Sequence, residues 1–172
     1  MFSSKSLLKA LAALAMVTLI ASCSDSEAVK SEAQGSGPQP IVLDIFKSPT
    51  CGCCKKWINH IDENGFQSKV HNRRDIFVIK KDKGIEPRYR SCHTAISKEG
   101  FIFEGHIPAK FIQQFLKETH PDGVLGLSVP GMPVGTPGME VSDKFQPYRV
   151  LLLKSDGTHE TYANVYSYEE QF

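Results

Sequence analysis

The sequence predicts an α/β fold with a mixed central sheet, and three observations support this prediction. Short β-branched and aromatic runs alternate with apolar residues at helical spacing, such as Trp57, Ile58 and Ile61. Asp156 and Gly157 lie between two apolar runs, as in a β-hairpin. The segment 41–172 has the usual length of one domain with its own core.

The expected elements follow in the order strand, helix, strand, helix, strand, strand, helix, and a second hairpin comes after them. The first helix has a clear end because Gly65 follows it, whereas the period of the run 76–79 is ambiguous. The predicted strands are 41–46, 68–71, 94–97, 101–104, 148–154 and 158–165. The predicted helices are 52–64, 75–83 and 109–119.

A segment rich in glycine, proline and methionine, Gly123–Glu140, separates the last helix from the second hairpin. We expect a long irregular loop here, and ordered loops of this length are usually functional or tightly packed. The loop is a candidate lid over a site. The hairpin either supports this loop or extends the sheet.

The first residues have the pattern of an export signal. Lys5 and Lys9 precede the apolar run 10–21, which is too short to span a bilayer as a helix. The run ends in a small-residue segment before Cys23 that resembles the bacterial lipobox, and this resemblance implies a lipoprotein signal over 1–22 and lipidation of Cys23. An ordinary signal with an incidental cysteine is the alternative.

The resemblance implies a periplasmic protein anchored by lipid alone, and Ser24 after the cysteine favours the outer membrane. Residues 23–40 are then the lipidated cysteine and a flexible linker, since this stretch has few large apolar side chains. Net charge is +1 and no basic stripe is present, so nucleic acid is not expected as a partner.

Soft metal ligands are concentrated in two short segments. Cys51, Cys53 and Cys54 lie at the start of the first predicted helix, and Cys92 directly precedes His93. Thiolates bind and bridge soft cations such as Cu(I), and imidazole also binds copper. The positive end of the helix dipole favours thiolates at Cys51 and Cys53. The sequence therefore predicts a site for a thiophilic metal.

Several alternatives remain for these cysteines. Stabilising disulfides are common in exported domains, but bridges within the cluster would close very small loops. Cys51 and Cys54 have the C-x-x-C spacing of a redox dithiol. Zinc also accepts such ligands, although soft bridging thiolates suit Cu(I) better. A c-type haem is excluded because Lys55, not histidine, follows Cys54.

The other candidate ligands are histidines and methionines. Cys92 and His93 can share a metal only if the backbone turns there, because neighbours on a strand point to opposite faces. His106 either borders the site or is a buried, hydrogen-bonded histidine. Met132 and Met139 offer thioethers for Cu(I), or they fill gaps between loop and core. No ligand context surrounds the remaining histidines, His60, His71, His120 and His159.

The element order, with cysteines between the first strand and its helix, resembles the thioredoxin fold. In that fold, the turn facing the cysteine pair carries a cis-proline, whereas this chain has Cys92 and His93 at that place. The nearby Pro108 opens the next helix, a common place for a trans proline. This difference favours a ligand cage over a general disulfide oxidoreductase.

Taken together, these residues resemble the CopG-type periplasmic copper-resistance proteins, which have a C-x-C-C cluster and a distant C-H pair. The resemblance implies a thioredoxin-like domain with a C-terminal extension that binds copper through its cysteines and interconverts Cu(I) and Cu(II). It includes the motifs 51–54, 91–95, 105–109, 129–133 and 138–140.

The sequence thus predicts a copper protein that holds Cu(I), with a multinuclear thiolate-bridged centre as the finer hypothesis. Its metal ligands are Cys51, Cys53, Cys54, Cys92 and His93. A periplasmic copper-handling protein is the expected partner, and copper redox chemistry is a secondary expectation. The alternative is a thiol-disulfide oxidoreductase that uses Cys51 and Cys54.

Overall fold

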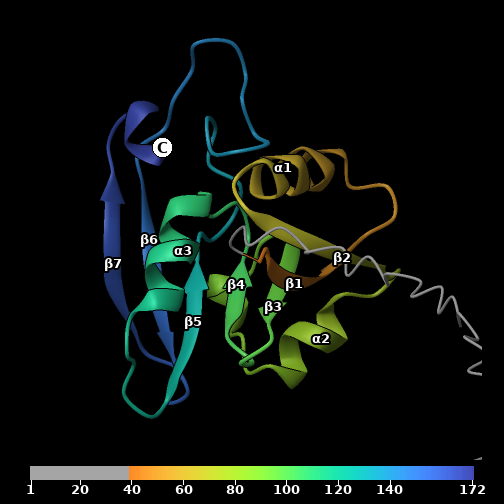
Figure 1. Ribbon diagram of the computed structural model, residues 1–172, viewed down its shortest axis with the longest axis vertical. Helices are drawn as coiled ribbons and strands as arrows, with labels where there is room; N and C mark the ends of the chain where they lie inside the picture. Colours follow the sequence, from red (N-terminus) through yellow and green to blue (C-terminus); the bar gives the residue numbers. More distant parts are fainter. Residues whose placement is uncertain (1–38) are drawn as a thin grey trace, which may run out of the picture. The chain divides into compact units, whose positions relative to one another are not determined.

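A seven-stranded sheet with the order β2-β1-β3-β4-β5-β6-β7 runs through the described residues, 39–172, of the computed structural model (Figure 1). The strands are β1 Ile41–Lys47, β2 Phe66–Asn72, β3 His93–Ser97, β4 Ile102–Glu104, β5 Val124–Ser128, β6 Tyr148–Lys154 and β7 His159–Val165. The helices are α1 Gly52–Glu63, α2 Phe77–Asp82 and α3 Ala109–Lys117, with short 3-10 turns at Pro87–Tyr89 and Glu169–Gln171.

The sheet is mixed, as the sequence predicted. β1 pairs in parallel with β2, and β4 with β5, while the other neighbouring pairs are antiparallel. The order β2-β1-β3-β4, with α1 between β1 and β2, gives the first part of the chain a thioredoxin-like arrangement. This arrangement brings the end of β1, and so the start of α1, next to the start of β3: Lys47 lies opposite His93.

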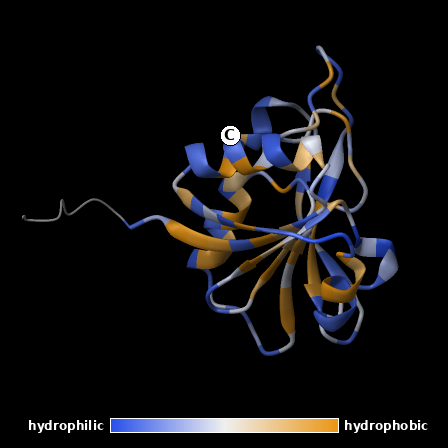
Figure 2. Cartoon of the chain, turned by 90° about the vertical axis from the view of Figure 1, so that its right-hand side faces the viewer, coloured by the Kyte–Doolittle hydropathy of each residue, from blue (hydrophilic) through white to orange (hydrophobic). Residues whose placement is uncertain are grey.

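Apolar residues fill both faces of the sheet. Phe103 belongs to a large cluster with Trp57 of α1 and Phe115 of α3, whereas its neighbour Ile102 belongs to a smaller cluster with Tyr89. Successive strand residues point to opposite faces, so α1 and α3 cover one face and the segment before β3 covers the other. Figure 2 shows hydrophobic colouring along the central strands and hydrophilic colouring on outer helical turns.

The expectation of an irregular segment over 123–140 is wrong for its first part, which forms β5. The sequence pattern does not indicate this strand, because Gly126 interrupts the apolar run. In the pairing with β6, a bulge lies between Val124 and Gly126. At Gly126, with φ +143°, an added Cβ would lie 1.9 Å from the carbonyl oxygen of Ile102. Only glycine allows β4 to approach so closely. Residues 129–140 do form an irregular loop.

The second hairpin extends the sheet, since β6 pairs with β5 and β7 pairs with β6. Helix α2 is shorter than the predicted 75–83 and starts at Phe77, whose backbone N–H donates to Oδ1 of Asp75. Pro108 is the N-cap of α3, and no cis peptide bond occurs among residues 39–172. No helix within those residues has the length and apolarity to cross a membrane. The predicted signal, Cys23 and all but the last two linker residues lie outside the described part of the chain.

Candidate metal centre

The first cysteine segment lies where β1 passes into α1. Cys51 is the N-cap of α1, and its Sγ accepts a hydrogen bond from the backbone N–H of Cys54, at 3.3 Å. Cys53 and Cys54 follow in the first turn, with Cys54 fully buried. A turn in which Cys51 N–H donates to the Ser48 carbonyl ends the strand, so the sulfurs gather at one edge of the sheet.

The second segment adds a fourth sulfur from a distant part of the sequence. Cys92 directly precedes β3, and its Sγ lies 3.5 Å from Sγ of Cys54 and 4.0 Å from Sγ of Cys53. Cys51 and Cys53 are 3.5 Å apart between their sulfurs. All four sulfurs lie within 4.8 Å of one another. The structure therefore brings together the four cysteines that the sequence predicted as ligands.

Cys51 and Cys54 form a disulfide, and Cys53 and Cys92 are free. The argument from loop size against a bridge within this cluster is therefore wrong for this pair. Their Cα atoms are 5.4 Å apart, a common separation for a disulfide, because the helix start folds the chain back within three residues. This pair can act as a disulfide or supply two thiolates, but it cannot do both at once.

Two histidines lie against Cys92. Nδ1 of His93 is 3.3 Å from its Sγ, and Nε2 of His106 is 3.0 Å away. Neighbouring residues within a strand would point to opposite faces of the sheet. Both residues can face one metal here, because Cys92 precedes the strand and His93 begins it. His106, predicted either at the rim or as a buried, hydrogen-bonded residue, is fully buried and also contacts this sulfur.

The hydrogen bonds of His106 determine which of its nitrogens faces the sulfur as an acceptor. Nδ1 lies 2.8 Å from the carbonyl oxygen of Pro137, which only accepts, so Nδ1 carries the proton. Nε2 then has a free lone pair toward Cys92. Burial lowers the pKa of His106, opposed by the Pro137 hydrogen bond, and this favours the neutral imidazole that binds metals.

His93 has a different environment. Burial lowers its pKa well below the usual value, and the neighbouring His106 and Lys80 add to this effect. Its ring packs on Trp57 with centroids 4.2 Å apart. Nε2 is buried and has no hydrogen-bond partner among the described residues. With only Nδ1 close to Cys92, His93 is placed to offer one nitrogen to a metal there.

The thiol of Cys92 is held in its protonated form when no cation is present. Burial raises its pKa to about 12, and the Cys53 thiol beside it adds to this effect through charge and a hydrogen bond. A bound cation reverses this preference, because a coordinated thiol loses its proton. Binding of a metal cation at this sulfur should therefore release a proton.

The irregular loop 129–140 packs on the first turn of α1. Gly138 has φ +87°, and a Cβ there would lie 2.7 Å from the carbonyl oxygen of Cys53 and 2.8 Å from the nitrogen of Trp57. The loop also supplies the Pro137 carbonyl that orients His106. These contacts depend on backbone positions, so no sequence pattern indicates them.

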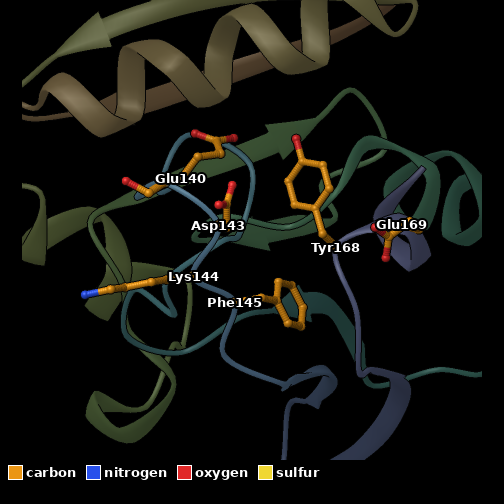
Figure 3. A pocket seen from close by; sticks show the side chains of 7 residues that line it. Glu140, Asp143, Lys144, Phe145, Tyr168 and Glu169 are labelled. Carbon is orange, nitrogen blue, oxygen red and sulfur yellow. The ribbon is translucent and has the colours of Figure 1, made fainter.

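Beyond Gly138 the chain lines a surface pocket of about 390 Å³. Figure 3 shows the acidic side chains Glu140 and Asp143 on one side of it and Tyr168 on the other. The lining of this pocket includes no cysteine or histidine, so it is distinct from the sulfur cluster.

Met132 is half exposed, and the backbone N–H of Met139 donates to the Thr136 carbonyl. Ligation by either thioether stays a prediction.

The donor set fits copper. Four sulfurs form one group, and Cys92, His93 and His106 form a second group that shares the Cys92 sulfur with the first. Thiolate and imidazole are ligands for Cu(I), and this centre has no carboxylate for a hard cation.

Comparisons with known proteins agree with this chemistry. A family model described as "Protein of unknown function, DUF411" matches residues 89–139, which include Cys92, His93, His106 and all but the last residue of the loop. A comparison with curated proteins gave no match.

Two solved structures of a copper resistance protein, copG, in Forms 1 and 2, are each 36% identical to this chain. Form 1 matches with a TM-score of 0.67 over 73% of this chain and 98% of its own. Form 2 matches with a TM-score of 0.68 over 74% and 99%. Together with the sulfur cluster, these matches show that the chain belongs to the CopG family of copper resistance proteins.

Proposed function

We propose that this protein binds Cu(I) through the thiolates of Cys51, Cys53, Cys54 and Cys92 as part of copper resistance. The observation that carries the proposal is the gathering of these four sulfurs within 4.8 Å from two distant segments. Four thiolates attract a soft monovalent cation strongly, and each can bridge two such ions. Zinc remains the weaker candidate.

A centre with more than one copper ion is the finer proposal. The two ligand groups share Cys92, so one sulfur has donors on both sides: cysteines on one and His93 and His106 on the other. A bridging thiolate at this position would serve two ions. Met132 and Met139 are proposed as donors that accept copper from, or pass it to, a periplasmic copper-handling protein.

The copper ions would also change oxidation state at this site. In the dithiol form, Cys51 and Cys54 can reduce two Cu(II) ions: the two thiols lose two protons and two electrons, a disulfide forms, and two Cu(I) ions result. The oxidised product of this step would be a disulfide of the kind that Cys51 and Cys54 form in the structure. Cys53 and Cys92 then remain as thiol ligands for Cu(I).

The place of action is proposed from the sequence. An exported chain, lipid-anchored through Cys23 at the outer membrane, would handle copper in the periplasm, a compartment in which disulfides form and persist. Two measurements test the anchor. Globomycin should block processing of the exported chain, and Cys23→Ser should abolish its lipid attachment.

The decisive experiment is a Cu(I) titration of residues 24–172, reduced anaerobically, against a chelator of known affinity. We expect tight binding that falls more than about 100-fold in Cys92→Ser, because loss of even outer-shell partners costs 10–100-fold. More than one copper per chain at saturation supports the multinuclear centre, and one equivalent contradicts it. Binding indifferent to Cys92 would overturn the proposed site.

A thiol-disulfide oxidoreductase is the second candidate, and the Cys51–Cys54 disulfide at a helix N-terminus favours it. This function leaves Cys53 and Cys92 without a role. Two variants separate the two functions: reduction of a protein disulfide by the dithiol form should survive Cys92→Ser and be lost in Cys51→Ser. Copper binding should be weakened in both.

A further inference from the structure

A fully buried ion pair lies behind the Cys92–His93 segment. Nζ of Lys80, from α2, is 2.5 Å from Oε1 of Glu104, at the end of β4, and both side chains are 0% exposed. A buried pair of this kind adds little net stability by itself, because desolvation offsets the attraction between the charges. Neither residue is a candidate ligand. The Glu104 carboxylate, however, also contacts the residues on either side of Cys92 and His93.

The Glu104 carboxylate holds the backbone on both sides of the ligand pair. Oε1 accepts a hydrogen bond from the backbone N–H of Ser91, at 2.6 Å, and Oε2 accepts one from the hydroxyl of Thr94, at 2.6 Å. Ser91 directly precedes Cys92, and Thr94 directly follows His93. One side chain therefore fixes the two residues that flank the ligands.

Lys80 completes this arrangement. Its Nζ also donates to Thr94 Oγ1, at 2.9 Å, so the cation bonds to two of the groups that surround the ligand segment. A carboxylate buried without a cation would be strongly destabilised, and Lys80 offsets part of that cost. The carboxylate is thus available as a charged acceptor, which binds an N–H more strongly than a neutral one.

We propose that Glu104, charge-balanced by Lys80, is a positioning residue that holds the Cys92 sulfur and the His93 ring in the geometry needed to capture Cu(I). The proposal rests on the proposed function, in which these two residues bind copper. If the segment were mobile, copper binding would have to order it, and affinity would fall by that cost. Outer-shell partners of metal ligands typically change affinity 10–100-fold.

Two charge-neutral double variants of the full chain test this role. Lys80→Met with Glu104→Gln keeps an acceptor for the Ser91 N–H, and Lys80→Met with Glu104→Leu does not. Each is reduced anaerobically and titrated with Cu(I) against a chelator, and exchange of the Ser91 amide hydrogen is followed by NMR without metal. Val165→Ala, a buried change in β7, controls for general loss of stability.

The Leu variant is expected to bind Cu(I) about 10–100-fold more weakly and to exchange its Ser91 amide faster, while the Gln variant stays close to the unchanged protein. Equal affinity in the Leu variant and the unchanged protein would overturn the positioning role. Equal losses in the Leu and Gln variants would also overturn it. Failure of the unchanged protein to bind Cu(I) would instead overturn the proposed function.

Thr94→Val keeps the test valid if the Leu variant does not fold. This nearly isosteric change leaves the ion pair and the Ser91 hydrogen bond in place and removes the two hydrogen bonds of the Thr94 hydroxyl, which donates to Glu104 and accepts from Lys80. A measurable fall in Cu(I) affinity, absent in Val165→Ala, supports the proposal. Unchanged affinity in Thr94→Val contradicts it.

Discussion

The Sγ atom of Cys92 lies 3.0 Å from Nε2 of His106, although the two residues are 14 positions apart. Cys92 directly precedes β3, and His106 follows the end of β4. The β3–β4 hairpin causes this contact, because its two strands run antiparallel and bring its ends together. The Pro137 carbonyl holds the proton on the opposite nitrogen of the ring. His106 is therefore a candidate copper ligand of the same rank as His93.

Replacing His106 by phenylalanine should weaken Cu(I) binding by at least about 10-fold, since a nitrogen beside Cys92 is lost while an aromatic ring is kept. A chelator competition on the reduced protein measures this change. His120→Phe is the matched control, because His120 hydrogen-bonds the Phe115 carbonyl and packs on that ring away from the sulfurs. An equal effect of both substitutions would show that His106 acts only through stability.

Trp57→Phe should lower the free energy of unfolding by roughly 2–4 kcal/mol. The indole N–H donates to the carbonyl oxygen of the buried Ile107, at 2.8 Å, and leaving that group unpaired costs about 1–3 kcal/mol, with lost packing in addition. Trp57 is the only tryptophan, so urea unfolding must be followed by circular dichroism. A loss below about 1 kcal/mol would contradict this account of the α1–sheet contact.

The cysteine segments and the core helices could be predicted because their signals are local. Helical spacing located α1, and the ligand chemistry of thiols identified Cys51, Cys53, Cys54 and Cys92 as one group, which the structure brings together. The α/β fold with a mixed sheet is also confirmed.

The features that could not be predicted depend on close approach between distant backbones. The apolar pattern does not indicate β5, because Gly126 interrupts it. Glycine is required at this position because the backbone of β4 lies against it. The Lys80–Glu104 pair joins α2 to β4 in a way that no spacing indicates. Loop entropy argues against a bridge between Cys51 and Cys54. The helix start nevertheless holds their Cα atoms at a separation that suits a disulfide, and the bridge forms.

Gly138→Ala should displace the loop from α1. Alanine at φ +87° costs about 1–2 kcal/mol, and its Cβ would also clash with the backbone of Cys53 and Trp57. We expect a loss of stability of at least that size in urea unfolding, together with weaker Cu(I) binding, because Pro137 next to it orients His106. Gly52→Ala is the control, since it has no atom within 4 Å of an added Cβ. Unchanged stability in Gly138→Ala would contradict the packing described for this loop.

Acid should destabilise the protein in part through His60. Its Nε2 accepts a hydrogen bond from the backbone N–H of Ala109 at the start of α3, at 3.0 Å, which requires the neutral ring. Burial lowers the pKa of His60 below 6.5, opposed by the charges of Glu140 and Glu63. The folded state therefore binds this proton more weakly than the unfolded state does, so the stabilisation is present above pH 6.5 and is lost as the pH falls through the folded pKa.

His60→Gln isolates this contribution, because a glutamine oxygen can accept the Ala109 N–H at any pH. Urea unfolding of the disulfide form between pH 7.5 and pH 5 should show a smaller loss of stability in this variant than in the unchanged protein. The difference between the two proteins is the relevant quantity, since burial also lowers the pKa of His93 and His106 and these act in the same direction in both. Parallel pH profiles would show that protonation of His60 is not coupled to folding.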